Sequence, residues 1–401
     1  MKQIFQALKI SEKVHWVGAV DWKLRDFHGY ATNRGTSYNA YLVLGEKIAL
    51  LDTVKAPFRE EMFQRISSLI EPGEIDYIIS NHSEMDHSGC LPEAVEIIRP
   101  EKILASKMGK DALENHFRGA FQVTAVNDGE KLNLGAVTLK FIETRMLHWP
   151  DSMFTFFEEE GILFSQDAFG MHLASSERFD DEFDEALLRQ EAAKYYANIL
   201  LPFSPLVKKL LESLNQMNLS PKMIAPDHGP IWRKNPNKIL EHYSLWAETA
   251  VSRKAVVVFD TMWGSTAKMA TAVAEGLKRG GLNPLLMPLG ASHRSEVAAE
   301  LLEAGALLVG SPTINGQMFP TVADLLTYLK GLKRPNLVGG AFGSHGWANK
   351  AVKQIEESLT EMKVEIAGEG VTAKYVPDEE ALQKCFELGL KTAEKVLAGI
   401  K

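Results

Sequence analysis

The spacing of hydrophobic residues changes near residue 250 of the chain. Before this point, short apolar runs separated by turn residues predict strands at 15–20, 40–44, 47–52 and 137–142. Between them, Met62, Ile66 and Ile70 recur at helical spacing and predict a helix over 58–70. After it, strand, loop and helix patterns repeat in that order, with strands predicted at 255–260, 285–289, 306–310, 337–342 and 364–366.

The two patterns predict two domains of different architecture. Mixed strands and helices over 1–250 favour an α+β domain with stacked sheets, and the regular alternation over 251–401 favours an α/β domain with a parallel, doubly wound sheet. A chain of 401 residues is long enough for two domains with separate cores. We place the boundary after the helix that carries Trp246.

Composition narrows the classes of partner. The formal net charge of −8 argues against a nucleic-acid-binding protein, which needs a basic surface. Cys90 and Cys385 are the only cysteines, so the chain lacks a disulfide framework and the Cys-x-x-Cys pairs of rubredoxin or iron–sulfur sites. No apolar run has the length of a membrane span or of a secretion signal. We expect a soluble, unprocessed cytoplasmic protein with no membrane partner.

The densest group of candidate metal ligands follows an apolar run at 75–79. Four of them fall within six residues, among Asn, Ser and Gly residues that favour a loop: His82, Glu84, Asp86 and His87. A regular helix or strand would turn at least one of these side chains away from the others. A loop at the end of a buried strand brings them together, and we interpret all four as metal ligands.

Three further candidates lie at or just past strand-like segments, the usual place for site residues on a rigid sheet: His148, Asp167 and His228. Together the seven residues offer four imidazoles and three carboxylates, too many for one ordinary zinc ion. Two metal ions that share a carboxylate fit better, and a shell without thiolates suits iron, manganese or zinc. Taken singly, each of the three is equally well explained as a packing or surface residue.

A second constellation follows the first strand predicted beyond residue 250. It consists of the loop residues Thr261, Met262, Trp263, Gly264, Ser265 and Thr266, which lead into a helix. Backbone N–H groups and the helix dipole at such a start bind phosphate, and the hydroxyls add donors. The loop lacks both the Gly-x-x-x-x-Gly-Lys pattern of nucleoside triphosphate sites and the Gly-x-Gly-x-x-Gly pattern of dinucleotide sites. A monophosphate cofactor remains.

Two more strand-end loops have the composition to hold a flat ring. One contains Pro312, Thr313, Ile314, Asn315 and Gly316, and the other contains Ser344, His345, Gly346, Trp347 and Ala348. In a sheet of order 2-1-3-4-5, the first and third strands flank the switch point at which FMN binds. Trp263 and Trp347 are then candidates to stack on the isoalloxazine. The alternative is that the tryptophans and glycines are ordinary turn and core residues.

The motif His82-x-Glu84-x-Asp86-His87, followed at long intervals by His148, Asp167 and His228, resembles the di-iron motif of the flavodiiron proteins, or A-type flavoproteins. The resemblance extends over essentially the whole chain, including 16–22, 147–152 and 260–263. It implies a metallo-β-lactamase-like αββα sandwich over 1–250, followed by a flavodoxin-like FMN-binding domain over 251–401.

The resemblance also implies roles for individual residues. His82, Glu84 and His148 would bind one iron, Asp86, His87 and His228 would bind the other, and Asp167 would bridge them. Glu84 replaces the second histidine of the His-x-His-x-Asp-His pattern known in hydrolytic relatives, which adds oxygen to the shell and favours iron. His28 and Tyr195 would be catalytic residues that form hydrogen bonds in the pocket. As lone residues, these two are equally well explained by packing.

By the same resemblance, we expect an enzyme that reduces dioxygen to water, nitric oxide to nitrous oxide, or both. FMN would pass the electrons, and an external donor such as a rubredoxin or a flavin reductase would supply them. The expected assembly is a head-to-tail homodimer, or a dimer of such dimers, with the flavin of one subunit near the iron pair of the other. The sequence does not decide between the two gases.

Two other functions compete with this one. The first is a zinc-dependent hydrolase of the glyoxalase II type fused to a flavodoxin-like electron-transfer domain, which Glu84 argues against. The second is a flavodoxin-like electron carrier whose first domain is a redox-inactive sensor or docking module. Retention of every ligand position argues against the second.

Overall fold

The computed structural model describes residues 4–217 and 219–400, and these residues form two compact units. The first unit contains the residues up to 28, 32–195 and 205–244. The second contains 29–31, 196–204 and the residues from 245 onward. The division predicted from the sequence, 1–250 and 251–401, stays a prediction about where each part folds by itself.

The first unit is built on two sheets. One has the order β1-β2-β7-β8-β9-β10-β11, with strands at Leu8–Lys9, Val14–Trp16, Tyr41–Leu44, Ile48–Leu51, Tyr77–Ser80, Lys102–Ser106 and Val123–Val126. The other has the order β12-β13-β14-β15-β16, with strands at Lys131–Asn133, Thr138–Glu143, Met153–Phe157, Ile162–Phe164 and Met223–Ala225. Parallel pairing aligns the ends of β8 with β9 and of β15 with β16, so the loops that follow these strands leave from shared edges.

Alternation along the strands explains why the two sheets stack. Tyr41 and Val43 of β7 face a core between the sheets that contains Phe141 and Phe164, whereas Leu42 faces a second core under helices. The helices over that second core are α1 (Arg59–Ser67), α3 (Leu91–Ile98) and α4 (Lys107–His116).

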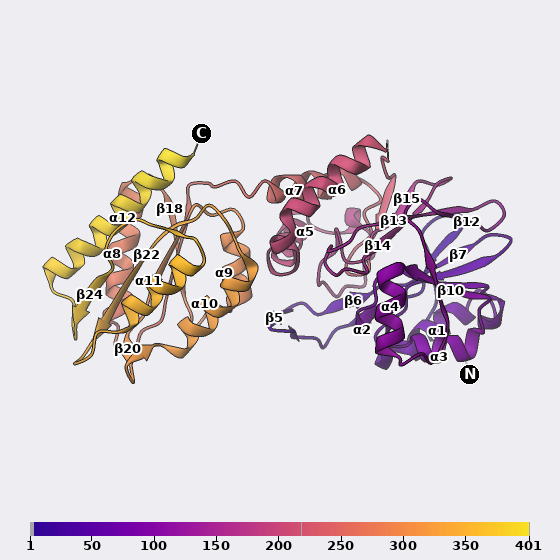
Figure 1. Ribbon diagram of the computed structural model, residues 1–401, viewed down its shortest axis with the longest axis horizontal. Coiled ribbons are helices and arrows are strands. Elements are labelled where there is room, and N and C mark those ends of the chain that lie inside the picture. The colour runs from indigo at the N-terminus through magenta and orange to yellow at the C-terminus, as the bar shows by residue number, and fades with distance from the viewer. Residues whose placement is uncertain (1–3, 218, 401) are drawn as a thin grey trace. The chain divides into compact units, whose positions relative to one another are not determined.

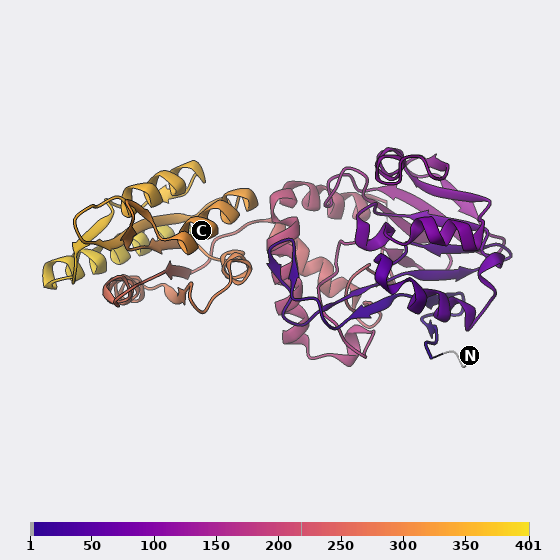
Figure 2. The same cartoon turned by 90° about the horizontal axis from the view of Figure 1, so that it is seen from below.

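The outer face of the other sheet is covered as well. Phe154 of β14 contacts Phe169, which in turn contacts Tyr243 of α7 (Pro236–Ala247). The helices α5 (Glu185–Tyr195) and α6 (Ser204–Gln216) precede α7 in the chain. Figures 1 and 2 show the strands of this unit layered between helices. The predicted αββα sandwich is confirmed.

One predicted strand of this unit was wrong in its extent. The run 15–20 forms two strands in different sheets, because β2 ends at Trp16 and β3 (Ala19–Asp21) pairs with β6 (Thr36–Tyr38). Gly18 lies at the crossing, where an added Cβ would stand 2.2 Å from the carbonyl oxygen of Tyr38. The close approach of two backbones at this glycine moves the chain from one sheet to the other.

The second unit is a parallel sheet of order β18-β17-β19-β22-β23, with β24 also paired to β22. Its strands are β17 (Lys254–Phe259), β18 (Asn283–Pro288), β19 (Ala306–Gly310), β22 (Val338–His345), β23 (Glu365–Ile366) and β24 (Val371–Lys374). In chain order this is 2-1-3-4-5, so the flavodoxin-like sheet is confirmed. Residues 255–258 are fully buried, as expected for a parallel strand covered on both faces.

Helices cover both faces of this sheet. They are α8 (Ser265–Arg279), α9 (Arg294–Leu301), α10 (Pro320–Leu332), α11 (Ala351–Glu361) and α12 (Glu379–Gly399). Residues of α8 and α12 share one core with β17 and β22, and Figure 1 shows α9, α10 and α11 on the other side. Across the described residues, no helix is both long and apolar enough to cross a membrane.

Candidate metal centre and ring pocket

The four clustered candidates follow β9, as the sequence predicts. His82 and Glu84 lie in the loop after Ser80, but Asp86 and His87 lie in a single helical turn, α2 (Met85–Ser88). The prediction of a plain loop was therefore right for the first pair and wrong for the second. Because the chain changes from loop to helix between Glu84 and Asp86, the two pairs join different ligand groups. His82 and Glu84 belong to one group, and Asp86 and His87 belong to the neighbouring one.

One group of possible ligands consists of His82, Glu84, His148 and Asp167, whose ligand atoms lie within 4.8 Å of one another. Nε2 of His82 and Nε2 of His148 are each 3.3 Å from Oε2 of Glu84. His148 comes from the loop between β13 and β14, and Asp167 from the segment after β15. Residues far apart in the sequence thus converge because their strands end at one edge of the sandwich.

A second group consists of Asp86, His87 and His228, within the same limit of 4.8 Å. Nε2 of His87 is 3.4 Å from Oδ1 of Asp86, and Nε2 of His228 is 3.3 Å from Oδ2 of the same carboxylate. His228 follows β16. All three residues are buried.

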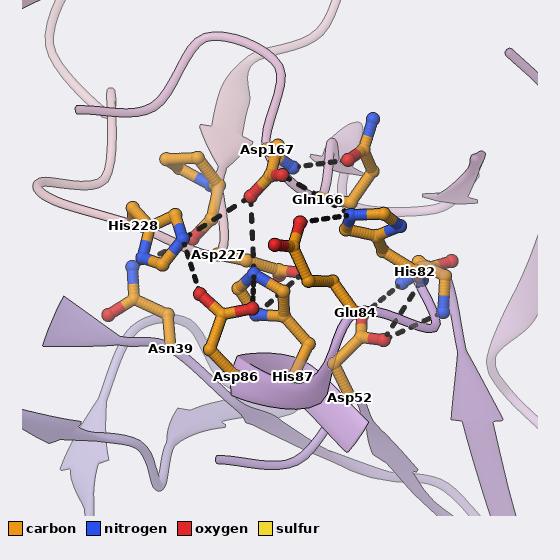
Figure 3. A network of polar contacts seen from close by, with 12 residues as sticks. Asn39, Asp52, His82, Glu84, Asp86, His87, Gln166, Asp167, Asp227 and His228 are labelled. Carbon is orange, nitrogen blue, oxygen red and sulfur yellow. Dashed lines mark hydrogen bonds and ion pairs between the residues drawn. The ribbon is translucent and has the colours of Figure 1, made fainter. Parts of the chain in front are cut away.

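Asp167 joins the two groups, as Figure 3 shows. Its Oδ2 lies 2.9 Å from Nε2 of His148 and 3.4 Å from Nε2 of His82. Its Oδ1 lies 3.2 Å from Nε2 of His87 and 3.4 Å from Nε2 of His228. One carboxylate therefore presents one oxygen to each group, which is the geometry of a bridging ligand between two metal positions.

The polar atoms in the middle of this cluster lack ordinary partners. Within the described part of the chain, both carboxylate oxygens of Asp86, Oδ1 of Asp167 and Nε2 of His87 are buried without a hydrogen bond. Buried polar atoms of this kind are rare in folded proteins unless water or an ion satisfies them. Imidazole and carboxylate donors that point inward and lack partners fit a pair of divalent cations.

The raised pKa values of two ligand histidines in the metal-free cluster also indicate a site for cations. Burial opposes a charge on His82, but the hydrogen bonds that its ring donates to the carboxylates of Asp151 and Glu84 outweigh it and raise the pKa of this imidazole well above its usual value. Burial likewise opposes a charge on His87, yet the neighbouring Asp86 and Asp167 raise the pKa of its imidazole to about 10. Without metal, protons supply the positive charge that the carboxylates require, and metal ions would replace them.

Residues behind the ligands, which the sequence analysis missed, hold the ligands in place. Oδ2 of Asp151 accepts hydrogen bonds from Nδ1 of His82 at 3.0 Å and from the backbone N–H of Ser83 at 2.6 Å. Oδ2 of Asp227 lies 3.6 Å from Nδ1 of His87. Both carboxylates stand next to predicted sequence motifs, and the tendency of ligating histidines to place a carboxylate behind the ring was a usable signal.

A second missed carboxylate group anchors the loop after β9. Asp52 accepts hydrogen bonds at 2.7 Å from both the backbone N–H and the side-chain amide of Asn81, and the side chain of Asn81 accepts one from Thr155. Asp52 comes directly after β8, the strand paired with β9. The network fixes the start of the ligand loop to its neighbouring strand.

A cavity of about 680 Å³ reaches the centre at Glu84 and Asp86. Its walls include Phe27, His28, Met85 and Trp149, and it is far larger than a diatomic molecule. The exposed imidazole of His28 lines it, with Nε2 3.6 Å from Oε1 of Glu84.

Tyr195 lies beside His172 and His228, and it is buried. Its ring centroid is 6.2 Å from that of His228 and 5.1 Å from that of His172, another buried histidine. Nδ1 of His172 lies 2.9 Å from the hydroxyl of Thr36, which is itself 3.3 Å from Nδ1 of His228. Tyr195 is therefore close to the ligands but does not line the cavity that His28 lines.

The second unit has its own pocket, of about 250 Å³, at the carboxyl ends of β17, β19 and β22. Several predicted residues line it: Met262, Trp263, Ser265, Pro312, Thr313, Ser344, His345 and Gly346. Tyr375 and Val376, which the sequence analysis missed, complete the lining from the end of β24. No local motif marks these two residues, because only the sheet order brings them to the pocket.

The predicted phosphate loop precedes α8, as expected. Gly264 has φ 82°, a backbone conformation that glycine adopts without strain, and its N–H donates to the hydroxyl of Thr261. The hydroxyl of buried Thr266 instead pairs with that of Ser344 at 3.0 Å. The orphan N–H groups of the first helical turn remain available for an anion.

Other predicted ring contacts lie elsewhere. Thr313 and Ile314 form β20, which pairs with β21 (Gln317–Met318) in a hairpin turned by Asn315 and Gly316. Ile314, Asn315, Gly316, Trp347 and Ala348 are not among the residues that line the pocket. Trp263 and Trp347 are 92% and 93% exposed, so neither is a core residue. Nδ1 of His345 is buried, and no described residue forms a hydrogen bond with it.

Two family models match the chain. One is described as an ODP family beta lactamase and matches residues 36–229, and the other is described as flavodoxin and matches residues 257–389. A nitric oxide reductase of Moorella thermoacetica is 48% identical over 395 residues, which cover 98% of this chain and 99% of that protein.

Two solved structures are similar over nearly the whole chain. The rubredoxin oxygen:oxidoreductase from Desulfovibrio gigas has a TM-score of 0.96 and 42% identity, with 98% of this chain and 99% of that chain covered. The flavodiiron protein from Giardia intestinalis has a TM-score of 0.94 and 34% identity, with 98% of each chain covered.

Proposed function

The chain belongs to the flavodiiron protein family, and we propose that it reduces dioxygen to water, nitric oxide to nitrous oxide, or both. The observation that carries this proposal is Asp167, which presents one carboxylate oxygen to each of two ligand groups. Two ferrous ions and one reduced FMN, when bound, would supply the four electrons that reduction of dioxygen to water requires. His82, Glu84, Asp86, His87, His148, Asp167 and His228 would hold the iron.

The ligand set favours iron over zinc. Glu84 places a carboxylate oxygen 3.3 Å from the ring nitrogens of both His82 and His148, where hydrolytic relatives of the fold carry a histidine. The additional hard oxygen ligand suits iron better than zinc. The competing function is a zinc hydrolase of the glyoxalase II type, and two zinc ions per purified chain together with thioester hydrolysis would establish it instead.

The cavity next to Glu84 and Asp86 suits a small uncharged substrate. Phe27, Met85 and Trp149 give it apolar walls, and the carboxylates mark where it meets the centre. We assign His28 the task of passing protons from solvent toward Oε1 of Glu84, since its exposed ring stands 3.6 Å away. The buried ring of Tyr195 lies beside His228, and it would determine how polar the surroundings of that ligand are.

We place FMN in the pocket of the second unit. Its phosphate would bind the loop 261–266 at the start of α8, and its ring would lie between the loops that carry Pro312 and His345. The flat, exposed side chains of Trp263 and Trp347 would then shield the ring. The buried Nδ1 of His345 would meet a polar edge of the flavin.

A head-to-tail dimer, or a pair of such dimers, would bring the two cofactors together. The cavity of about 680 Å³ exceeds the needs of a gas and has room for part of a flavin and its shielding tryptophan from a second copy. A dimer also gives the exposed Trp263 and Trp347 a surface to cover them. Activity that falls on dilution in step with dissociation, followed by sedimentation, supports this assembly, and a fully active monomer excludes it.

An external protein would supply the electrons. One structural relative is named for rubredoxin, and a rubredoxin or a flavin reductase is the proposed donor here. Both described cysteines are buried and free, which suits a reducing cytoplasm.

The deciding experiment measures steady-state consumption of each gas by protein loaded with iron and FMN. The same donor system supplies electrons in both assays, and protein that lacks iron serves as the control. Consumption of either gas that depends on both cofactors supports the proposal. Failure to consume either gas, with both cofactors bound and reduced, would favour the redox-inactive docking module.

A further inference from the structure

We infer that Asp227 is a positioning residue for the metal centre: its carboxylate stands behind the His87 imidazole and directs Nε2 of that ring toward the position shared with Asp86 and His228. The inference rests on the proposed metal centre, and it adds that the two metal positions differ in their affinity for metal. The position that depends on His87 would be the weaker of the two.

The second ring nitrogens of His82, His87 and His228 are held in different ways. Nδ1 of His82 is hydrogen-bonded to Asp151 at 3.0 Å, and Nδ1 of His228 donates to the carbonyl oxygen of Ser37 at 2.6 Å. Nδ1 of His87 has no hydrogen bond from any described residue, and the facing group is Oδ2 of Asp227 at 3.6 Å. A nitrogen–oxygen distance of 3.6 Å permits an ion pair but exceeds a hydrogen bond. Of these three rings, that of His87 is held least tightly from behind.

The state of Asp227 itself is unusual. It is fully buried, and neither of its carboxylate oxygens has a hydrogen-bond partner among the described residues. Its backbone is held on both sides, since its N–H donates to Gln166 at 2.8 Å and its carbonyl accepts from Asn39 at 2.7 Å. A buried carboxylate without hydrogen bonds destabilises a protein, so packing alone does not account for one at this position. Its orientation toward Nδ1 of His87 does.

The nearby Asp52 does not compete for this role. Its carboxylate is occupied by the backbone and side-chain N–H groups of Asn81. A carboxylate behind a ligating imidazole fixes which nitrogen carries the proton and where the other nitrogen points. With Asp227 opposite Nδ1, the lone pair of His87 is left at Nε2, on the side of Asp86 and Asp167.

The two positions are therefore unequal. Behind His82, Asp151 already accepts a hydrogen bond, and the backbone N–H of Ser83 holds it at 2.6 Å. Behind His87, Asp227 is held through its backbone alone. Loss of such an outer carboxylate usually weakens metal binding by about 10–100-fold. We expect this loss at one position only when Asp227 is replaced.

The test uses Mn²⁺, which reports both stoichiometry and pairing by electron paramagnetic resonance. Metal-stripped wild-type chain should bind two Mn²⁺ and give the spectrum of a coupled pair. The Asp227→Asn variant should bind the first Mn²⁺ with unchanged affinity and the second about 10–100-fold more weakly. At the Mn²⁺ concentration that pairs the wild type, the variant should show the six-line signal of an isolated ion.

Three controls separate positioning from general damage. Asp111→Asn, on the exposed surface of α4, should behave as wild type. Asp151→Asn should weaken the other position instead. In a His87→Ala background, Asp227→Asn should have no further effect on either affinity, because the carboxylate acts through this ring.

Thermal unfolding of the metal-free proteins separates a positioning role from a structural role, because replacement of a structural residue would lower the Tm. Asp227→Leu, which keeps the branched shape and the number of heavy atoms and has no polar atoms, should match or exceed the Tm of the wild type while it binds the second Mn²⁺ weakly. If Asp227→Asn does not fold, Asp227→Leu takes its place in the Mn²⁺ titration.

Two results would overturn the inference while the metal centre stands: unchanged binding of both Mn²⁺ ions by Asp227→Asn, or an equal loss in the His87→Ala background. A wild-type chain that binds no metal pair would overturn the proposed function as well.

Discussion

The metal centre and the ring pocket occupy equivalent places, at strand ends, but they are built differently. Of the seven candidate ligands of the centre, five are buried and Glu84 and His148 are partly buried, and carboxylates face imidazoles a few ångströms away. The pocket is formed by backbone turns and half-exposed side chains around the sheet edge, with two almost fully exposed tryptophans beside it. The metal centre therefore depends on which residues occupy the ligand positions, whereas the ring pocket depends mainly on the order of the strands.

This difference predicts that a single substitution can abolish metal binding at the centre, whereas a substitution in the pocket only weakens FMN binding. The largest effect is expected for Asp167→Ala, which removes an oxygen from both ligand groups at once. Because several kcal/mol of metal stabilisation disappear, activity should fall by about a thousandfold or more. Iron per chain, measured by elemental analysis, should fall with it, and flavin absorbance should not change. An active Asp167→Ala protein with two irons would remove the basis of the bridging geometry.

The next largest effect is expected at the phosphate loop. Replacing Thr261 and Ser265 together by Ala removes two hydroxyls but leaves the backbone N–H groups of α8 in place. A hydrogen bond to a charged group contributes about 1.5–3 kcal/mol, so FMN affinity should fall by about 10–100-fold for each hydroxyl that contacts the phosphate. Fluorescence titration of the FMN-free protein measures this change. Loss of iron in the double variant would contradict the independence of the two regions.

A smaller effect is expected for the tryptophans. Trp263→Ala and Trp347→Ala should each weaken FMN binding by a few-fold, because an aromatic pair adds about 0.5–1.5 kcal/mol. Both side chains are more than nine-tenths exposed, so the Tm of the FMN-free chain should not change. A large fall in that Tm would show that these residues pack within their own subunit.

The last effect is on stability and concerns the pH dependence of the metal-free protein. Asp86 and Asp167, against the opposing effect of burial, raise the pKa of His87 in the folded state to about 10. The stabilisation is therefore complete below the ordinary histidine pKa, near 6.5, and is lost as pH rises through about 10. The Tm of the metal-free chain should fall over this range by about 2–4 °C for each kcal/mol lost. In the iron-loaded chain metal replaces these protons, so a similar slope there would contradict the ligand assignment.

The same contrast explains what the sequence could predict. The seven candidate ligands were identifiable because His, Asp and Glu at loop positions are rarely grouped without a reason, and the structure brings all seven into two adjoining groups. The two architectures were also predictable, since buried parallel strands and two-sided strands have different apolar patterns. Asp151 and Asp227 were missed because a carboxylate behind a ligand has no spacing rule of its own.

Other features depend on contacts that no local pattern records. The run 15–20 divides at Gly18 because the backbone at Tyr38 approaches it, and Tyr38 is distant in sequence. Tyr375 enters the pocket only because β24 pairs with β22. In each case tertiary contacts, and not local propensity, decide the outcome.

We propose that Asp167 unites two ligand groups into one dinuclear centre. X-ray absorption of the chain loaded anaerobically with two equivalents of Fe²⁺ tests it directly. A centre bridged by Asp167 should show two bound irons and a metal–metal scattering path at about 3.5–4 Å, the usual spacing of such sites. One bound iron, or two without a metal–metal path, would contradict it.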